Sequence, residues 1–283
     1  MPIKLSNSQD EALDVSFLGF SGGERHVQLG EFEKTQQFVI RALLRTSDDI
    51  FDLLLLADAL NAKFNAPQLF IEIPYLPYAR QDRVCAPGQA FSLKVISALL
   101  GQIENVSKLV VWDCHSPVGL ELTGAYNVPA EDIIQTDQAF TDLINAQDSV
   151  LICPDKGAIN RTQKIAETLG KHSPLPVVYC EKVRDPATGN ILRTDVKSDD
   201  LAGKTALITD DICDGGYTFI KIAEILREKN VERVVLFVTH GIFSKGLAVF
   251  DGLLDEIFTT QSFMHEDNPR LTVIPYAFRF KTK

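Results

Sequence analysis

The sequence lacks the cysteine patterns that bind zinc or build a disulfide framework. No two of its cysteines form a C-x-x-C pair, and they are scattered along the chain. Most lie in or beside apolar runs, where an unpaired cysteine behaves as a small hydrophobic residue. We therefore expect a reduced, cytoplasmic protein. The five cysteines are Cys85, Cys114, Cys153, Cys180 and Cys213.

Positive charge and long apolar segments are also scarce. The 28 Lys and Arg residues against 38 Asp and Glu residues give a formal net charge of -10, whereas nucleic-acid-binding proteins usually present a basic face. The densest apolar run, residues 53–57, is far too short to span a bilayer. The amino-terminal MPIKLSNSQDE does not follow the pattern of a signal peptide. From these absences we expect that the protein binds neither nucleic acid nor a membrane.

What the 283 residues do contain is a regular alternation of strand-like and helix-like segments. Apolar strands separated by helices predict an α/β fold with mainly parallel sheets flanked by helices. Each half repeats one plan, a strand that ends in an acid and is followed by a helix, so we expect two similar domains, residues 1–145 and 146–283. The polar, turn-rich residues 181–204 are interpreted as a functional loop. Expected strands are 68–74, 108–113, 149–153, 176–180, 205–209 and 233–239, and expected helices are 46–64, 91–102, 157–169 and 216–229.

The stretch ALITDDICDGGYTFI, residues 206–220, combines carboxylates with a glycine turn at the expected end of a strand. Ligands of parallel α/β sheets bind beyond the carboxyl ends of the strands, where Asp210 and Asp211 are expected to lie. Free N–H groups at the start of the next helix can bind one phosphate, while carboxylates accept hydrogen bonds from vicinal hydroxyls. A sugar phosphate meets both requirements. Its phosphate turn would consist of Asp214, Gly215, Gly216, Tyr217 and Thr218.

This stretch resembles the ribose-5-phosphate loop of phosphoribosyltransferases and of ribose-phosphate diphosphokinases (PRPP synthetases). A second motif separates these two classes. IPYLPYARQDR, residues 73–83, is similar to the ATP-binding signature of the diphosphokinases, which phosphoribosyltransferases lack. The segments FSGGE, DCHSP, PDKGAINR, LAGKTALITDD and THG resemble further diphosphokinase motifs in the same order. The resemblance extends from about residue 20 to beyond residue 246.

The resemblance implies two phosphoribosyltransferase-like domains and an Mg²⁺-dependent transfer of the diphosphoryl group of ATP to the 1-hydroxyl of ribose 5-phosphate, giving PRPP and AMP. It implies a homo-oligomer, dimer or hexamer, with ATP bound partly across a subunit boundary. EKVRDP resembles the start of the family's catalytic loop, so Lys182 and Arg184 are the implied catalytic cations. The residues 210, 211 and 214–218 named above are implied to bind ribose 5-phosphate. The implied ATP-binding residues are Phe20, Glu24, Arg80, Gln81, Asp82, Arg83 and His115, and the implied metal-binding residues are His115 and Asp155.

The sequence also departs from the family pattern at several positions. Gly22 stands where F-S-D-G-E has an aspartate, residues 84–92 carry no Lys or Arg, and Tyr217 stands where glycine is usual. Every charged group implied in the chemistry is nevertheless kept. Two alternatives remain open, a phosphoribosyltransferase that consumes PRPP and a non-catalytic, diphosphokinase-like regulatory subunit. The motif at residues 73–83 argues against the first, and the retained Lys182 and Arg184 argue against the second.

Overall fold

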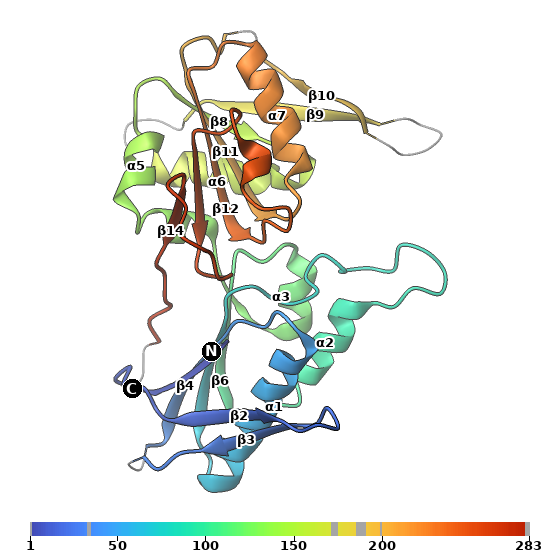
Figure 1. Ribbon diagram of the computed structural model, residues 1–283, viewed down its shortest axis with the longest axis vertical. Coiled ribbons are helices and arrows are strands. Elements are labelled where there is room, and N and C mark those ends of the chain that lie inside the picture. Colours follow the sequence, from blue (N-terminus) through green and yellow to red (C-terminus); the bar gives the residue numbers. More distant parts are fainter. Residues whose placement is uncertain (1, 33–34, 171–174, 185–190, 199, 281–283) are drawn as a thin grey trace. The chain divides into compact units, whose positions relative to one another are not determined.

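The computed structural model describes residues 2–32, 35–170, 175–184, 191–198 and 200–280, with the backbone alone for residues 182–184 and 191–194 (Figure 1). The chain divides into two compact units. The first consists of Met1–Val128 together with Ala277–Lys283, and the second of Pro129–Tyr276. Each unit contains a mainly parallel sheet with helices. No helix in the described part of the chain is both long enough and apolar enough to cross a membrane.

The first unit is built on a five-stranded sheet in the order β1-β4-β5-β6-β7. β1 runs antiparallel to β4, and the other neighbouring strands pair in parallel. A separate antiparallel hairpin, β2–β3, packs on α1. The strands are β1 Ile3–Asn7, β2 Val15–Gly19, β3 Arg25–Leu29, β4 Gln37–Ala42, β5 Gln68–Ile73, β6 Val106–Trp112 and β7 Tyr126–Val128; the helices are α1 Ser47–Lys63, α2 Ser92–Leu100 and α3 Pro117–Thr123.

Helix α1 confirms the expected helix over residues 46–64, and its start has a local cause. The backbone N–H of Asp49 donates to the Thr46 hydroxyl (3.2 Å), and the backbone N–H of Thr46 donates to the Asp49 carboxylate (2.8 Å). This capping box satisfies two N–H groups that would otherwise lack partners. The apolar side of the helix, with Leu53, Leu56 and Leu60 fully buried, packs in the core of the first unit.

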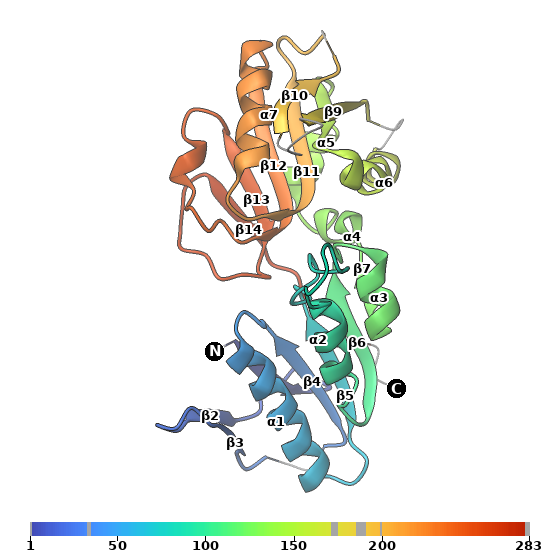
Figure 2. The same cartoon turned by 90° about the vertical axis from the view of Figure 1, so that its right-hand side faces the viewer.

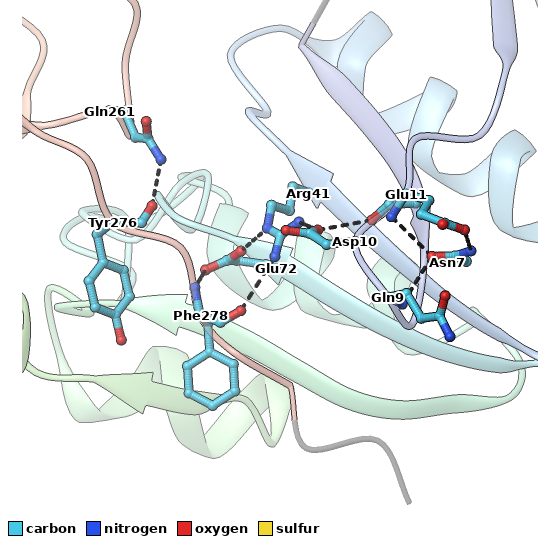
Figure 3. A network of polar contacts seen from close by, with 10 residues as sticks. Asn7, Gln9, Asp10, Glu11, Arg41, Glu72, Gln261, Tyr276 and Phe278 are labelled. Atoms are coloured by element: carbon cyan, nitrogen blue, oxygen red, sulfur yellow. Dashed lines mark hydrogen bonds and ion pairs between the residues drawn. The ribbon is translucent and has the colours of Figure 1, made fainter.

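The last described residues of the chain lie on the first sheet, on the face opposite that core (Figure 3). Side chains alternate along β5, so Ile71 joins the core cluster while its neighbour Glu72 faces the other way. Glu72 is fully buried, and its Oε1 accepts hydrogen bonds from the backbone N–H of Phe278 (2.7 Å) and from Trp112 Nε1 (2.9 Å). Arg41 Nε donates to the other oxygen (2.9 Å). A buried carboxylate therefore anchors the carboxyl-terminal segment.

The second unit is built on a seven-stranded sheet in the order β10-β9-β8-β11-β12-β13-β14, with helices on both faces (Figure 2). β10 runs antiparallel to β9, and the other neighbours are parallel. The strands are β8 Ser149–Cys153, β9 Val177–Arg184, β10 Ile191–Val196, β11 Thr205–Cys213, β12 Arg233–Gly241, β13 Glu256–Thr260 and β14 Leu271–Ile274; the helices are α4 Ala130–Ile134, α5 Gln138–Ile144, α6 Ile159–Leu169 and α7 Tyr217–Glu228, with 3₁₀ turns Lys156–Ala158 and Ala248–Phe250.

The division between the units differs from the expected boundary at residue 145. Phe140 of α5 is fully buried, with ring centroids 5.2 Å from Phe237 and 5.0 Å from Phe258. The Ser149 hydroxyl also donates to the Leu143 carbonyl (2.5 Å). These contacts place residues 130–144 in the second unit, so the chain passes between the units at Val128–Pro129. The end of the chain, expected in the second domain, belongs to the first unit from Ala277 onward.

Two strands of the second unit extend further than predicted. β11 was expected to end at Thr209, but its pairing with β12 continues to Cys213, whereas its pairing with β8 ends at Ile208. The segment 181–204, interpreted as a loop, begins as a hairpin in which β9 pairs with β10. The polar composition that suggested a loop belongs to a hairpin at the edge of the sheet, where β10 has a neighbouring strand on one side only.

Candidate functional site

The carboxyl ends of the parallel strands in the second unit collect the charged residues that the sequence singled out. Asp155 directly follows the end of β8, and Asp210 and Asp211 lie in the part of β11 that extends beyond β8. Lys182 and Arg184 lie at the end of β9, the neighbour of β8 on its other side. Their side chains are outside the described part of the structure. Because β9, β8 and β11 run in the same direction, all these positions share one edge of the sheet.

Asp210 and Asp211 share one cation, Arg161 of α6. Arg161 Nη1 lies 3.4 Å from Asp210 Oδ1, and Nη2 lies 3.5 Å from Asp211 Oδ2. Burial, and then the neighbouring Asp211 charge, raises the pKa of Asp210 well above its ordinary value, and Arg161 opposes this shift. Sequence reasoning gave Arg161 no role, although it is the final residue of PDKGAINR. Its spacing from Asp155 was the signal that could have identified it.

The turn between β11 and α7 requires glycine at one position. Gly216 has a φ of +79°, and a Cβ atom there would lie 2.5 Å from Cζ of Phe250. α7 begins immediately afterwards, and the first N–H groups of a helix have no acceptor within it. Tyr217, the unexplained departure from the family pattern, is the first residue of this helix and is 59% exposed. Its ring therefore does not fill the turn.

The loop after β12 supports this turn through the backbone. The N–H groups of Ile242 and Phe243 donate to the Cys213 carbonyl at 2.8 and 3.0 Å, and that of Ser244 donates to the Asp214 carbonyl at 3.1 Å. His240 of the THG motif is buried, with Nδ1 3.0 Å from the Ser262 hydroxyl. It therefore stabilises the sheet from within.

Exchanging Gly216 for alanine is expected to destabilise the protein, because a left-handed φ costs about 1–2 kcal/mol for a residue with a Cβ. The clash with Phe250 adds about 1–3 kcal/mol. The matched control is Gly215→Ala, whose Cβ would meet only the Lys245 side chain, at 3.6 Å, an ordinary contact. Urea unfolding followed by circular dichroism compares the two variants. Equal midpoints would contradict the proposed strain at Gly216.

In the first unit, two candidate groups follow neighbouring parallel strands. Arg80–Arg83 form a turn after β5, in which the Gln81 N–H donates to the Tyr78 carbonyl (2.9 Å), and His115 follows β6. The N–H of Leu93 in α2 donates to the Gln81 carbonyl (3.3 Å), which connects the turn to that helix. Arg80, Gln81, Arg83 and His115 are exposed, and Asp82 is partly buried. These residues lie at one edge of the sheet, accessible to a ligand.

Phe20 and Glu24 do not join that group within the first unit. They form the tip of the β2–β3 hairpin, where the Phe20 N–H donates to the Glu24 carbonyl (2.9 Å), and Phe20 is 58% exposed. Arg25 and Asp52 fix the hairpin on α1 (Nε–Oδ1, 2.9 Å). The hairpin tip lies apart from the carboxyl ends of β5 and β6 in both views (Figure 1, Figure 2). The expected ATP-binding residues of the first unit thus lie in two separate regions, the tip of the β2–β3 hairpin and the carboxyl ends of β5 and β6.

The two residues expected to bind a metal belong to different units, His115 to the first and Asp155 to the second. Among the residues that the structure describes, no three His, Cys, Asp or Glu side chains gather into a metal site. Asp155 Oδ1 accepts a hydrogen bond from the Gly157 N–H (2.9 Å), which orients its carboxylate. The oxygen ligand suits Mg²⁺, which usually takes one or two carboxylates together with substrate phosphates; an imidazole suits it less well.

Two family models match the chain, the N-terminal domain of ribose phosphate pyrophosphokinase over residues 7–103 and the phosphoribosyl transferase domain over residues 130–249. A ribose-phosphate pyrophosphokinase of Pyrococcus abyssi is 34% identical over 277 residues, 96% of this chain and 91% of that protein. Another, from Pyrococcus furiosus, is 34% identical over 254 residues, 88% of this chain and 86% of that protein.

The crystal structure of phosphoribosylpyrophosphate synthetase from Mycobacterium smegmatis has the same fold, with a TM-score of 0.77 and 22% identity. The match covers 94% of this chain and 87% of that one. The expected fold of two similar, mainly parallel α/β domains is confirmed. The chain belongs to the ribose-phosphate pyrophosphokinase (diphosphokinase) family.

Proposed function

We propose that this protein transfers the β,γ-diphosphoryl group of ATP to the 1-hydroxyl of ribose 5-phosphate, giving PRPP and AMP. The observation that supports this function is that one member of the family has candidate binding residues at the edges of two separate sheets. The turn at residues 210–218 fits a sugar phosphate, and the turn at Arg80–Arg83 fits a nucleotide. A phosphoribosyltransferase would use the first edge and would not need the second.

Ribose 5-phosphate would bind with its two ends on the two parts of the turn. The carboxylates of Asp210 and Asp211 accept hydrogen bonds from the ribose hydroxyls, and the Arg161 charge opposes the rise in the pKa of Asp210 that burial causes. The phosphate binds the N–H groups at the start of α7 and the Thr218 hydroxyl. The anomeric hydroxyl is thereby left at the sheet edge that also carries Asp155 and the end of β9.

ATP would bind at the other edge. Arg80 and Arg83 offer charge for phosphates and planar surfaces for a base, Gln81 can bond a base edge, and the exposed His115 can donate to a phosphate. Phe20 and Glu24 lie apart from these residues in their own unit, so we assign their contact with the base to a second copy of the chain. A homo-oligomer, dimer or hexamer, is part of this proposal.

The reaction is an attack by the 1-hydroxyl on the β-phosphorus of ATP, which breaks the bond to the oxygen bridging the α- and β-phosphates. Lys182 and Arg184 are assigned to stabilise the negative charge that develops around this centre. Asp155 is the side chain best suited to hold Mg²⁺ through an oxygen. When bound, Mg²⁺ supplies charge neutralisation on the phosphates.

The test is a reaction of the purified full-length protein with ATP, ribose 5-phosphate and Mg²⁺, followed by chromatography of the nucleotides. We expect AMP and PRPP in equal amounts, and no product when the Mg²⁺ is chelated. Formation of ADP in place of AMP would contradict diphosphoryl transfer. Consumption of PRPP with a nucleobase and release of pyrophosphate would identify a phosphoribosyltransferase, and a folded sample without either activity would identify a regulatory subunit.

A further inference from the structure

A lysine that no motif includes lies against the phosphate turn. Lys245 belongs to the loop that follows β12, next to Ser244, whose N–H donates to the Asp214 carbonyl (3.1 Å). Its Cγ, Cδ and Cε atoms lie 4.0, 3.7 and 3.6 Å from the position of a Cβ on Gly215. The aliphatic part of the side chain therefore passes beside the turn at Gly215.

The position of Lys245 is fixed by the same contacts that hold the turn. Phe243 and Gly246, on either side of it, have positive φ values of 46° and 71°, and the Gly246 N–H donates to the Phe243 carbonyl (2.8 Å). The N–H of Phe243 also donates to the Cys213 carbonyl (3.0 Å). The loop and the phosphate turn thus form one hydrogen-bonded structure, from which Lys245 extends over Gly215.

The charge of Lys245 has no partner within the described part of the chain. It takes part in no ion pair or hydrogen bond there. The nearest comparable cation along α7, Lys221, is already paired, with Nζ 2.7 Å from the Glu224 carboxylate. An exposed ammonium beside the first N–H groups of α7 favours a dianion at this place.

We propose that Lys245 is a specificity-determining residue that binds the 5-phosphate of ribose 5-phosphate. The inference rests on the proposed function and adds a cation to a turn whose other phosphate donors are uncharged. Asp210 and Asp211 bind hydroxyls, which unphosphorylated ribose also has, so only the phosphate end can distinguish the two sugars. The ammonium supplies part of that distinction, because a charge-assisted hydrogen bond is stronger than a neutral one.

The experiment measures steady-state kinetics of PRPP formation by Lys245→Ala, Lys245→Arg and the matched control Lys221→Ala. Loss of one charge-assisted contact corresponds to about tenfold in affinity. We therefore expect Lys245→Ala to raise the KM for ribose 5-phosphate about tenfold and to leave kcat and the KM for ATP unchanged. Lys245→Arg should recover most of this loss, and Lys221→Ala should behave as the parent protein.

Calorimetric titration with ribose 5-phosphate and with ribose separates this inference from the proposed function. We expect Lys245→Ala to bind ribose 5-phosphate about tenfold more weakly than the parent does, with no change for ribose. An unchanged affinity for ribose 5-phosphate would overturn the role of Lys245 even if the parent makes PRPP. A parent that binds the sugar phosphate but makes no PRPP would overturn the proposed function and leave the binding result for Lys245 standing. Equal weakening for both sugars would also overturn the role of Lys245, because the effect would not depend on the phosphate.

Discussion

Replacing Arg41 by methionine is expected to lower the free energy of unfolding of the first unit by about 3 kcal/mol at neutral pH. Glu72 is fully buried, and Arg41 Nε is the donor to its Oε2 (2.9 Å). Removing one partner of a buried ion pair leaves the other charge uncompensated, which costs about 3–5 kcal/mol. We expect the lower end of this range, because the Arg41 side chain is itself 26% exposed.

This loss is expected to depend on pH. Burial raises the pKa of Glu72, and the hydrogen bonds from Phe278 and Trp112 and the Arg41 charge oppose the shift. A carboxyl with a raised pKa holds its proton more tightly in the folded protein, so its contribution to stability is fully present below the pKa of the unfolded chain and is lost as the pH rises through the folded pKa. Without Arg41 the folded pKa rises further. The deficit of the variant should therefore be smaller at about pH 5 than at about pH 8.

Urea unfolding followed by tryptophan fluorescence measures both effects, because Trp112 is the only tryptophan in the sequence and donates to Glu72 itself. The control is Asp10→Asn, which removes the exposed second partner of Arg41 and should cost less than about 1 kcal/mol. In a Glu72→Gln background, Arg41→Met should cost less than it does in the parent, since no buried charge remains. A deficit that is equal at both pH values would contradict this account.

The same network explains why the path of the carboxyl terminus was missed. The Phe278 N–H and the Glu72 carboxylate are 206 residues apart in the sequence, and no local pattern encodes a contact over that distance. A signal was nevertheless present, because QLFIEI contains an acid in an otherwise apolar buried strand. A buried charge requires partners, and that requirement predicts that some segment must cover this face of the sheet without saying which.

Local sequence patterns predicted correctly those elements whose formation depends on neighbouring residues in the sequence. The capping box at Thr46 and Asp49 marks the start of α1, and the apolar run SVLIC coincides with β8. The predicted domain boundary was wrong because Phe140 is buried by tertiary contacts, which the sequence does not show. The segment around Phe140 also lacks the composition of a linker. The predicted end of β11 was wrong because the strand keeps pairing with β12, at Asp210, Ile212 and Cys213, after its pairing with β8 has ended.

In the candidate site, too, the sequence predicted what depends on local patterns and missed what depends on tertiary contacts. Motif spacing placed Asp155, Asp210 and Asp211 on one sheet edge, since each follows or ends a strand of the same parallel sheet. Arg161 and Lys245 were missed because their relation to the site depends on packing, in one case of α6 against β11 and in the other of the loop after β12 against Gly215. Arg161 belongs to the PDKGAINR motif, but the motif alone does not show that it contacts Asp210 and Asp211, and no motif at all includes Lys245.

Lys182→Ala is expected to lower kcat by about 10²–10³-fold, the effect of removing one preorganised contact to charge that develops in a transition state. Lys182 lies in β9 opposite Thr194 of β10, so its backbone is held in a hairpin that does not depend on the side chain. The melting midpoint should therefore stay unchanged, and so should the affinity for a non-hydrolysable ATP analogue, because the contact acts mainly in the transition state.

The matched control is Lys197→Ala, which removes a cation of the same hairpin region. Lys197 is 52% exposed and lies 3.2 Å from the Glu181 carboxylate, a surface pair that contributes little to stability. Its loss should leave kcat unchanged. An equal fall in kcat for both variants would mean that the general positive charge of this region matters and not a contact made by Lys182. An unaltered kcat in Lys182→Ala would remove that residue from the mechanism, and the stabilising charge would then have to come from another cation, such as Arg184.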